Sequence, residues 1–352
     1  MNTGNLRNDS PFFSVVVPVY NVKDYLSRCM DSILNQDFTS YEVLIVDDGS
    51  TDGSSSLCDY YSSNDKVHVI HKKNGGLASA RNEGMDYISG KYVLFIDSDD
   101  WIEHSTLTVL YQAIQKNQNQ KEIDLIKYNY FRDDKIVKLC KSCAKPGYYE
   151  KSNMDELLSL ALCDTGKYSL SACMHAYRVD LIEKNKIRFV SEREVGSEDY
   201  LFNIQFMFCA RNAIVVDEAL YHYDCRDGSI TQRYRANLPK KYTLLFNELL
   251  KFIDKIGLYD LYSGRVTYFY VWSLLYGTCL MNEYQVTDDH SLLEGRKNVK
   301  EYFKYKEFKF AIKKSDKRKL TIRKKIQLLA MFLDFEPLFY YMFYVKVHKK
   351  VH

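Results

Sequence analysis

The sequence predicts an α/β fold with a mostly parallel central sheet, followed by a C-terminal α-helical region. Short, almost continuously apolar segments alternate with helical patterns over residues 13–97, as in a parallel sheet covered by helices on both faces. With 352 residues, of which 46% are hydrophobic and 27% charged, the chain is long enough for about two domains and too apolar to stay disordered. After about residue 235, long aromatic-rich helical patterns take over.

The expected elements follow one another in a regular order. They are strand 13–19, helix 22–35, strand 41–48, helix 54–63, strand 66–71, helix 77–89, strand 91–97, helix 104–120 and strand 123–130. Beyond an irregular stretch at 131–150, the list continues with helices 153–163 and 198–210, a strand or hairpin at 214–231, and helices 238–256 and 265–282.

The end of the chain combines a basic segment with an apolar run. Residues 301–352 contain 14 Lys or Arg and 5 Asp or Glu, although the whole chain carries a net charge of only +3. The apolar run 326–345 is about long enough to cross a bilayer, but Asp334, Glu336 and Pro337 interrupt it. We therefore expect two short amphipathic helices, broken at Pro337, that lie on an anionic membrane surface. The alternative is a helical hairpin packed against the rest of the chain.

Other features of the composition narrow the classes of function. Nine Cys residues are too few for a disulfide scaffold in a chain of this length, and the polar N-terminus lacks the apolar stretch of a signal peptide. We therefore expect reduced thiols and a cytoplasmic protein, peripheral at the inner face of the cell membrane. The single CxxC pair, Cys140 and Cys143, has no second pair to complete a zinc site. No nucleic-acid recognition motif accompanies the basic segment, so no nucleic-acid partner is expected.

Polar residues follow three of the predicted strands where each strand ends. These stretches run from Pro18 to Asn21, from Asp47 to Ser50 and from Asp97 to Asp100. In an open parallel sheet they meet at one edge, where ligands bind. Carboxylates gathered there need a cation, and hard oxygen ligands suit Mg²⁺ or Mn²⁺ when substrate phosphates complete the shell. Neither GxGxxG nor GxxxxGK(S/T) follows the first strand, which argues against a dinucleotide cofactor and a P-loop and favours a divalent ion that bridges a diphosphate.

Six motifs keep a fixed order along the chain. They are PVYNVKDYLSRCMDSILNQ, VDDGSTDGS, NGGLASARNEG, GKYVLFIDSDDW, SEDYLF and CRDGSIT. Over about residues 12–232 they resemble the family 2 glycosyltransferases of the GT-A fold. The resemblance implies a Rossmann-like nucleotide-sugar-binding domain at 1–232 and an α-helical C-terminal region at 233–352. It also implies metal-dependent transfer of a sugar from a UDP-sugar to an acceptor hydroxyl, with inversion at the anomeric carbon.

The resemblance further implies which residues bind the nucleotide sugar. They are Pro18, Tyr20, Asn21, Asp48, Asn74, Arg81, Asp97, Ser98, Arg226 and Ser229. Pro18, Tyr20 and Asp48 are expected to surround the base. Arg81 or Arg226 is expected to stabilise the charge that builds on the β-phosphate. The alternatives are a helix-capping role for Asp48 and a simple turn at Arg226 and Ser229.

Asp97 and Asp99 form a DxD pair, which the resemblance implies as the site of Mn²⁺ or Mg²⁺. Asp99 is the expected direct ligand, and Asp97 faces the ribose or the metal. Asp100 either joins them or fixes the loop. His222 either completes the metal shell or packs within its strand.

An inverting displacement also needs a base on the opposite face of the sugar. The family pattern assigns this role to Asp199, with Glu198 as the fallback and a plain helix N-terminal acid as the alternative. The expected acceptor is a growing surface glycan, free or lipid-linked, met at the membrane by the C-terminal helices. Transfer to a polyprenyl phosphate is the nearest alternative. A nucleotidyltransferase and a catalytically silent scaffold of a glycan-assembly complex are more distant ones.

Overall fold

A computed structural model describes residues 10–117, 122–164, 167–225, 234–315 and 320–348. The chain divides into two compact units. The first comprises Met1–Ala161, Gly166–Glu192 and Glu198–Arg226, and the second comprises Leu162–Thr165, Arg193–Ser197 and Asp227–His352. The domain limits expected from the sequence, 1–232 and 233–352, stay a prediction.

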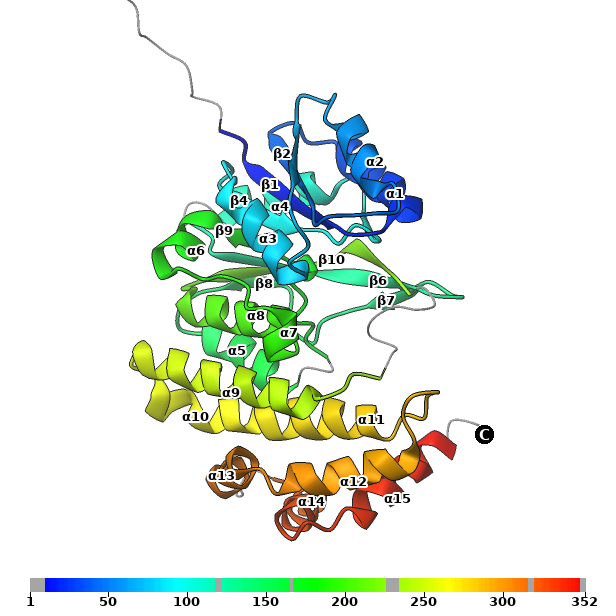
Figure 1. The fold of residues 1–352 in the computed structure, drawn as a ribbon. Coiled ribbons are helices and arrows are strands. Elements are labelled where there is room, and N and C mark those ends of the chain that lie inside the picture. The colour runs from blue at the N-terminus through cyan, green and yellow to red at the C-terminus, as the bar shows by residue number, and fades with distance from the viewer. Residues whose placement is uncertain (1–9, 118–121, 165–166, 226–233, 316–319, 349–352) are drawn as a thin grey trace, which may run out of the picture. The chain divides into compact units, whose positions relative to one another are not determined.

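Ten strands of the described residues form one sheet in the first unit (Figure 1). They are β1 (Phe13–Val19), β2 (Tyr41–Asp47), β3 (Val67–His71), β4 (Tyr92–Phe95), β5 (Trp101–Ile102), β6 (Leu125–Asp133), β7 (Lys138–Cys140), β8 (Gly147–Tyr149), β9 (His175–Arg178) and β10 (Ala213–Asp224). The strand order is β3-β2-β1-β4-β9-β6-β10-β5, with β7 paired to β6 and β8 paired to β10.

Two groups of parallel strands make up the centre of this sheet. Strand β1 runs parallel to β2 on one side and to β4 on the other, and β2 runs parallel to β3. Strands β6 and β10 are also parallel, and β9 joins the two groups because it pairs antiparallel with both β4 and β6. Every residue of β1 and β2 is buried, as expected of central strands covered on both faces. The α/β fold with parallel central strands is confirmed.

Helices connect these strands, and six of them lie where the sequence predicts them. These six are α1 (Lys23–Leu34), α2 (Ser54–Tyr61), α3 (Leu77–Asp86), α4 (Thr106–Asn117), α5 (Met154–Cys163) and α8 (Glu198–Cys209). The sequence prediction does not contain α6 (Val179–Asn185), the 3₁₀ turn η1 (Ala172–Met174) or α7 (Glu192–Val195), of which residues 193–195 belong to the second unit. Helix α3 packs closely on the sheet at Gly84, where a Cβ atom would come within 2.5 Å of Val16 Cγ1. A glycine at this position therefore brings α3 close to β1.

Two expectations from the sequence are corrected. The irregular stretch at 131–150 contains β7 and β8, which pair antiparallel with β6 and β10. Strands β5 and β9 are missing from the sequence prediction altogether. These four strands are only two to four residues long, and such short segments carry too little alternation to be recognised without their partners.

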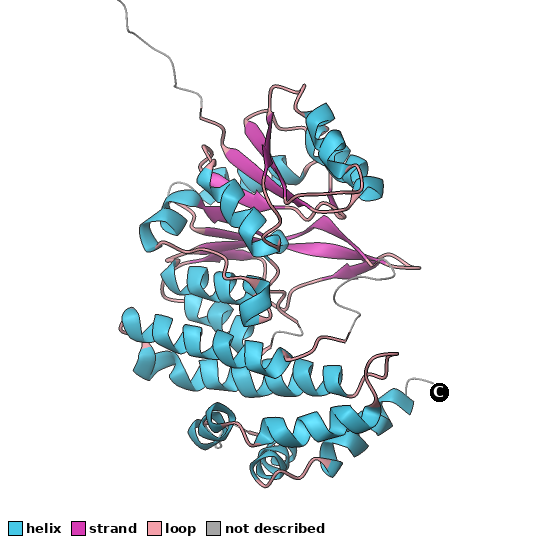
Figure 2. Cartoon of the chain, in the orientation of Figure 1, coloured by secondary structure: helices cyan, strands magenta, loops and turns pink. Residues whose placement is uncertain are grey.

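Helices and their connecting loops make up the described part of the second unit (Figure 2). They are α9 (Leu238–Lys255), α10 (Tyr259–Tyr268), the π-helix η3 (Phe269–Cys279), α11 (Leu280–Glu283), α12 (Leu292–Phe303), α13 (Lys306–Lys314), α14 (Ile322–Phe332) and α15 (Pro337–His348). The predicted break at Pro337 is confirmed, because α14 ends before it and α15 begins at it. None of the helices in the described part of the chain combines the length and the apolar character needed to span a membrane.

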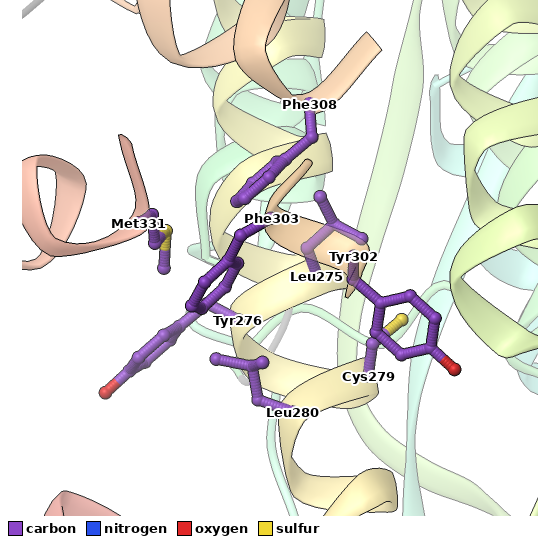
Figure 3. A pocket seen from close by; sticks show the side chains of 8 residues that line it. All are labelled: Leu275, Tyr276, Cys279, Leu280, Tyr302, Phe303, Phe308 and Met331. Atoms are coloured by element: carbon purple, nitrogen blue, oxygen red, sulfur yellow. The ribbon is translucent and has the colours of Figure 1, made fainter. Parts of the chain in front are cut away.

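A small apolar pocket lies among the helices of the second unit (Figure 3). It is lined by Leu275, Tyr276, Cys279, Leu280, Tyr302, Phe303, Phe308 and Met331, which come from η3 and from α11 to α14. Tyr302 directs its hydroxyl to Glu283 Oε1, at 2.8 Å. The pocket is thus part of the apolar interior that joins these helices.

Candidate active site

The carboxyl ends of β1, β2 and β4 lie side by side, because β1 pairs with both other strands. The polar residues that follow these strands therefore gather at one edge of the sheet, as the sequence predicts. Asn21 Oδ1 accepts a hydrogen bond from Thr51 N at 2.8 Å, and Asp48 N donates to Val19 O at 2.9 Å. These bonds hold the loop after β1 against the loop after β2.

Three of the predicted nucleotide contacts are exposed at this edge. Tyr20 is 50% exposed, and Asn21 and Asn74 are exposed as well. Asn21 has a φ of 51°, in the left-handed region, so the chain turns sharply after β1. Pro18 is buried within β1, opposite Val46 of β2. A ligand at this edge can reach Tyr20, Asn21 and Asn74 directly, whereas Pro18 shapes the strand beneath them.

Asp48 is buried and organises the glycine loop that precedes α3. Its carboxylate accepts hydrogen bonds from Gly75 N at 2.9 Å and from Gly76 N at 2.8 Å, and Lys72 Nζ lies 2.8 Å from Oδ1. Its oxygens therefore contact this loop and not the start of α2, where Ser54 N donates to Asp52 Oδ1 at 2.9 Å. This geometry disfavours the helix-cap alternative, and contact with the base stays a prediction.

Arg81 is the centre of an ionic network beneath the edge. Its side chain, on α3, is 1% exposed, with Nη1 2.6 Å from Asp199 Oδ1 and 3.2 Å from Glu198 Oε1. Its Nη2 lies 2.7 Å from Asp97 Oδ1. Burial lowers the pKa of the guanidinium, but the carboxylates of Asp199 and Asp97 raise it by more, so it stays charged. This arrangement favours a positioning role for Arg81 over the predicted direct contact with the nucleotide.

Through Arg81, the first Asp of the DxD pair is joined to the predicted base. Asp97 and Asp199 bind different nitrogens of one guanidinium, although they are 102 positions apart in the sequence. Such a planar fork holds two carboxylates in a defined geometry, which a single ammonium group cannot do. The structure therefore brings together the two predicted parts of the site, DxD and base, in one hydrogen-bonded cluster.

The two acids at the start of α8 are partly desolvated. The side chains of Glu198 and Asp199 are 12% and 18% exposed. Burial raises the pKa of both carboxyls. The charge of Asp199 raises the pKa of Glu198 further, and the charge of Asp97 raises that of Asp199, whereas the charge of Arg81 lowers both pKa values. A carboxylate whose pKa is raised is a better proton acceptor, which is the property that a general base needs.

The DxD segment divides into accessible and buried acids. The Asp97 side chain is 30% exposed, and Asp99 is partly exposed, whereas Ser98 and Asp100 are 5% and 2% exposed. Asp100 accepts hydrogen bonds from Tyr221 Oη at 2.5 Å and from Asp224 N at 2.8 Å. Burial and the charges of Asp97 and Asp99 raise its pKa to about 8. These hydrogen bonds favour the second of the two roles expected for Asp100, which is to fix the loop.

Asp97 and Asp99 fit the requirements of a divalent cation. The charges of both carboxylates contribute to the raised pKa of Asp100, and Asp97 contacts Arg81 through Oδ1. Within the described residues, no group of three or more His, Cys, Asp or Glu side chains is arranged to hold a metal alone. An ion held by one or two carboxylates, with phosphate oxygens and water in its other positions, suits such a donor set, and Mg²⁺ and Mn²⁺ accept it.

His222, on β10, is held between two carboxylates. Its Nδ1 lies 2.8 Å from Asp133 Oδ2, and its Nε2 lies 2.8 Å from Glu103 Oε1. The ring stacks on Trp101, with centroids 4.8 Å apart, and on Phe131 at the same distance. Metal binding to His222 would have to displace one of the carboxylates, so the geometry favours the packed alternative, and its ligand role stays a prediction.

Arg28, on α1, reaches the DxD segment although the sequence analysis does not single it out. Its Nη2 donates to Asp99 O at 2.8 Å and lies 2.5 Å from Asp224 Oδ2, and its guanidinium lies 3.9 Å from the ring centroid of Trp101. A lone basic residue on a helix surface carries no sequence signal of such contacts, which depend on strands far along the chain. Arg226 and Ser229 lie outside the described residues.

Comparisons with known proteins identify the family of the chain. The family model described as Glycosyl transferase family 2 matches residues 14–185. EpsH of Bacillus subtilis (strain 168) is 30% identical over 294 residues, which are 83% of this chain and 83% of EpsH. Glycosyltransferase GlyG of Streptococcus pneumoniae serotype 4 is 31% identical over 234 residues, covering 63% of this chain and 73% of GlyG.

A solved structure agrees in fold. S. aureus TarS 1–349 in complex with UDP-GlcNAc superposes with a TM-score of 0.68 at 22% sequence identity, covering 93% of this chain and 89% of that one. The relatives share their family with the motifs that run in order along this chain. The chain belongs to the family 2 glycosyltransferases and is a glycosyltransferase.

Proposed function

We propose that this glycosyltransferase transfers a sugar from a UDP-sugar to a hydroxyl of a glycan or lipid-linked glycan, with inversion and with the aid of Mn²⁺ or Mg²⁺. The observation that carries the proposal is the Arg81 cluster, in which Asp97 and Asp199 bind one buried guanidinium at 2.7 and 2.6 Å. The donor sugar and the base that activates the acceptor must be held close together for the transfer to occur. This cluster joins a residue suited to the donor site with a residue suited to act as the base.

The choice of a UDP-sugar is supported from two directions. S. aureus TarS 1–349 binds UDP-GlcNAc in its crystal structure, and its fold is similar. In this chain, Tyr20 and Asn74 are exposed at the sheet edge, and Asp48 holds the loop that carries Asn74. An exposed aromatic ring and an amide beside a rigid loop can stack on a base and hydrogen-bond it.

In the proposed reaction, Asp199 takes the proton of the acceptor hydroxyl. The acceptor oxygen forms its bond to the anomeric carbon as the bond from that carbon to the β-phosphate oxygen breaks, and UDP leaves. A divalent cation at Asp97 and Asp99 supplies charge stabilisation to the diphosphate. Arg81 orients Asp97 and Asp199, and Asp100, with Tyr221 and Asp224, keeps the DxD segment in place.

A panel of UDP-sugars, with GDP-sugars and dTDP-sugars as controls, tests the donor and the metal. We expect UDP release from one UDP-sugar that depends on Mn²⁺ or Mg²⁺. Asp99→Ala should lower this release at least about 100-fold, because the cation stabilises charge on the leaving diphosphate. Asp65→Ala removes an exposed acid from the same unit and should leave UDP release unchanged.

Two results would contradict this part of the proposal. An unaltered metal response in Asp99→Ala would remove Asp99 from the metal site. Failure of the protein to bind UDP by calorimetry, with or without metal, would instead favour the catalytically silent scaffold.

The pH dependence of kcat/KM tests the base. Because burial raises the pKa of Asp199, the carboxyl is protonated at a higher pH than an ordinary aspartate, and a protonated base is inactive. We expect kcat/KM to fall as pH decreases, with a midpoint clearly above about 4, the usual range of Asp. The measurement is kcat/KM from about pH 4 to about pH 8 with donor held constant. A rate that does not change across this range would contradict a buried base of raised pKa.

A further inference from the structure

Helix α14 carries an exposed apolar face. Ile322, Ile326, Leu329 and Leu333 are 78%, 54%, 57% and 63% exposed. Their spacing of four, three and four residues places them on one side of the helix and its C-terminal end. An exposed apolar stripe of this length on a helix usually marks an interaction surface.

The opposite side of α14 is anchored in the second unit. Leu328 and Met331 are 3% and 0% exposed, and Gln327 Nε2 donates to Tyr276 Oη at 2.9 Å. Lys324 Nζ lies 5.0 Å from the ring centroid of Trp272. The helix is therefore held by one face, and its exposed apolar face is directed outward by packing on the other.

The two acids that interrupt the apolar run are both paired with cations, although only Glu336 is buried, and the Asp334 side chain is 38% exposed. Asp334 Oδ1 lies 2.6 Å from Lys309 Nζ. Glu336 is fully buried and binds Arg296 through two hydrogen bonds of 2.9 Å. These pairs neutralise both carboxylates with cations from α12 and α13, and they fix the turn between α14 and α15.

Exposed cations flank the apolar face. Arg323 and Lys325 are exposed on α14, and Lys313 and Lys314 are exposed in the last turn of α13. Phe335, in the turn before α15, is 55% exposed. Apolar and aromatic side chains bordered by Lys and Arg, with the nearby acids neutralised by ion pairs, are the pattern of a helix that lies in the headgroup region of an anionic bilayer.

We propose that the face formed by Ile322, Ile326, Leu329, Leu333 and Phe335 docks on the surface of an anionic lipid bilayer. The apolar side chains enter the boundary between headgroups and acyl chains, and the flanking cations contact lipid phosphates. A second copy of the chain is the less suitable occupant, because two such faces would bring their cations together and repel. The docking goes beyond sugar transfer, since it gives the place where a lipid-linked acceptor is met.

Co-sedimentation of the full chain with lipid vesicles tests this surface. We expect binding to vesicles of phosphatidylcholine mixed with phosphatidylglycerol, weak binding to phosphatidylcholine alone, and weaker binding as salt is raised. The double variant Ile326→Glu/Leu329→Glu should lower the partition coefficient at least about tenfold, because it replaces inserted apolar groups with charges. The matched control is Leu293→Glu, which alters a residue 81% exposed on α12 and should bind like the unaltered chain.

A second variant tests the contribution of the cations to vesicle binding separately from that of the apolar face. Arg323→Gln/Lys325→Gln keeps the apolar face and should lower binding to the anionic vesicles only. All three variants alter exposed residues, so an unchanged melting temperature is expected of each. Equal binding to both vesicle types, or full binding by the double Glu variant, would overturn the proposal. So would a dimer in sedimentation analysis that the double Glu variant dissolves. Sugar transfer to a water-soluble acceptor, followed by UDP release, does not require vesicles. It therefore tests the proposed function separately from vesicle binding.

Discussion

Asp199→Asn is expected to lower kcat for sugar transfer about 10³-fold while changing the Kd for UDP by no more than about twofold. The amide cannot take a proton, but its oxygen can still accept the hydrogen bond that Arg81 Nη1 now donates to Asp199 Oδ1. The network that holds Asp97 therefore survives, and only proton transfer is lost. The measurements are single-turnover rates of product formation and calorimetric titration with UDP.

Glu198→Gln is the matched control for this variant. It removes the same charge from the adjacent residue of α8, which contacts the same Arg81 nitrogen at 3.2 Å. We expect it to keep most of the rate. If Glu198→Gln were the inactive variant and Asp199→Asn the active one, the role of base would move to Glu198. If Asp199→Asn lost UDP affinity in step with its rate, Asp199 would belong to the donor site.

Arg81→Met is expected to lower the free energy of unfolding by about 3–5 kcal/mol, because it leaves desolvated carboxylates without their cation. The guanidinium is 1% exposed and lies within 3.2 Å of Asp97, Glu198 and Asp199. Its loss should also raise the pKa of Asp199, since the charge of Arg81 lowers that pKa in the folded protein. The acidic limb of the rate profile then moves to higher pH in the fraction that stays folded.

Urea unfolding followed by circular dichroism measures the stability effect. The matched control is Arg188→Met, which removes an arginine 35% exposed that pairs with Glu183 at 3.0 Å. Exposed ion pairs contribute little, so this control should change the stability by less than about 1 kcal/mol. A loss of about that size in Arg81→Met would show that the three carboxylates do not depend on Arg81.

The central strands and their polar ends could be predicted because the evidence for them is local. Strands β1 and β2 are buried along their whole length, so each appears in the sequence as one nearly continuous apolar segment. Asp47 is the last residue of β2, and Asp97 comes two residues after the end of β4. In a parallel sheet the carboxyl ends of the strands meet at one edge. The position of these acids could therefore be predicted without knowing any side-chain contact.

The C-terminal break was predictable for a similar reason. Proline lacks a backbone N–H and starts a helix more readily than it continues one, so Pro337 begins α15. The ion pairs of Asp334 with Lys309 and of Glu336 with Arg296 were not predictable. In the sequence these acids only interrupt an apolar run, and their partners lie on other helices.

The sequence by itself determined the α/β class, the parallel order of the first strands and the set of residues gathered at the sheet edge. Only the tertiary structure decided what these residues touch. It directed Arg81 to Asp199 across 118 positions and enclosed His222 between Glu103 and Asp133. The physical reason is the range of the forces involved. Burial and backbone preference act on each residue and its neighbours, whereas an ion pair depends on two side chains that only the complete fold brings within 3 Å.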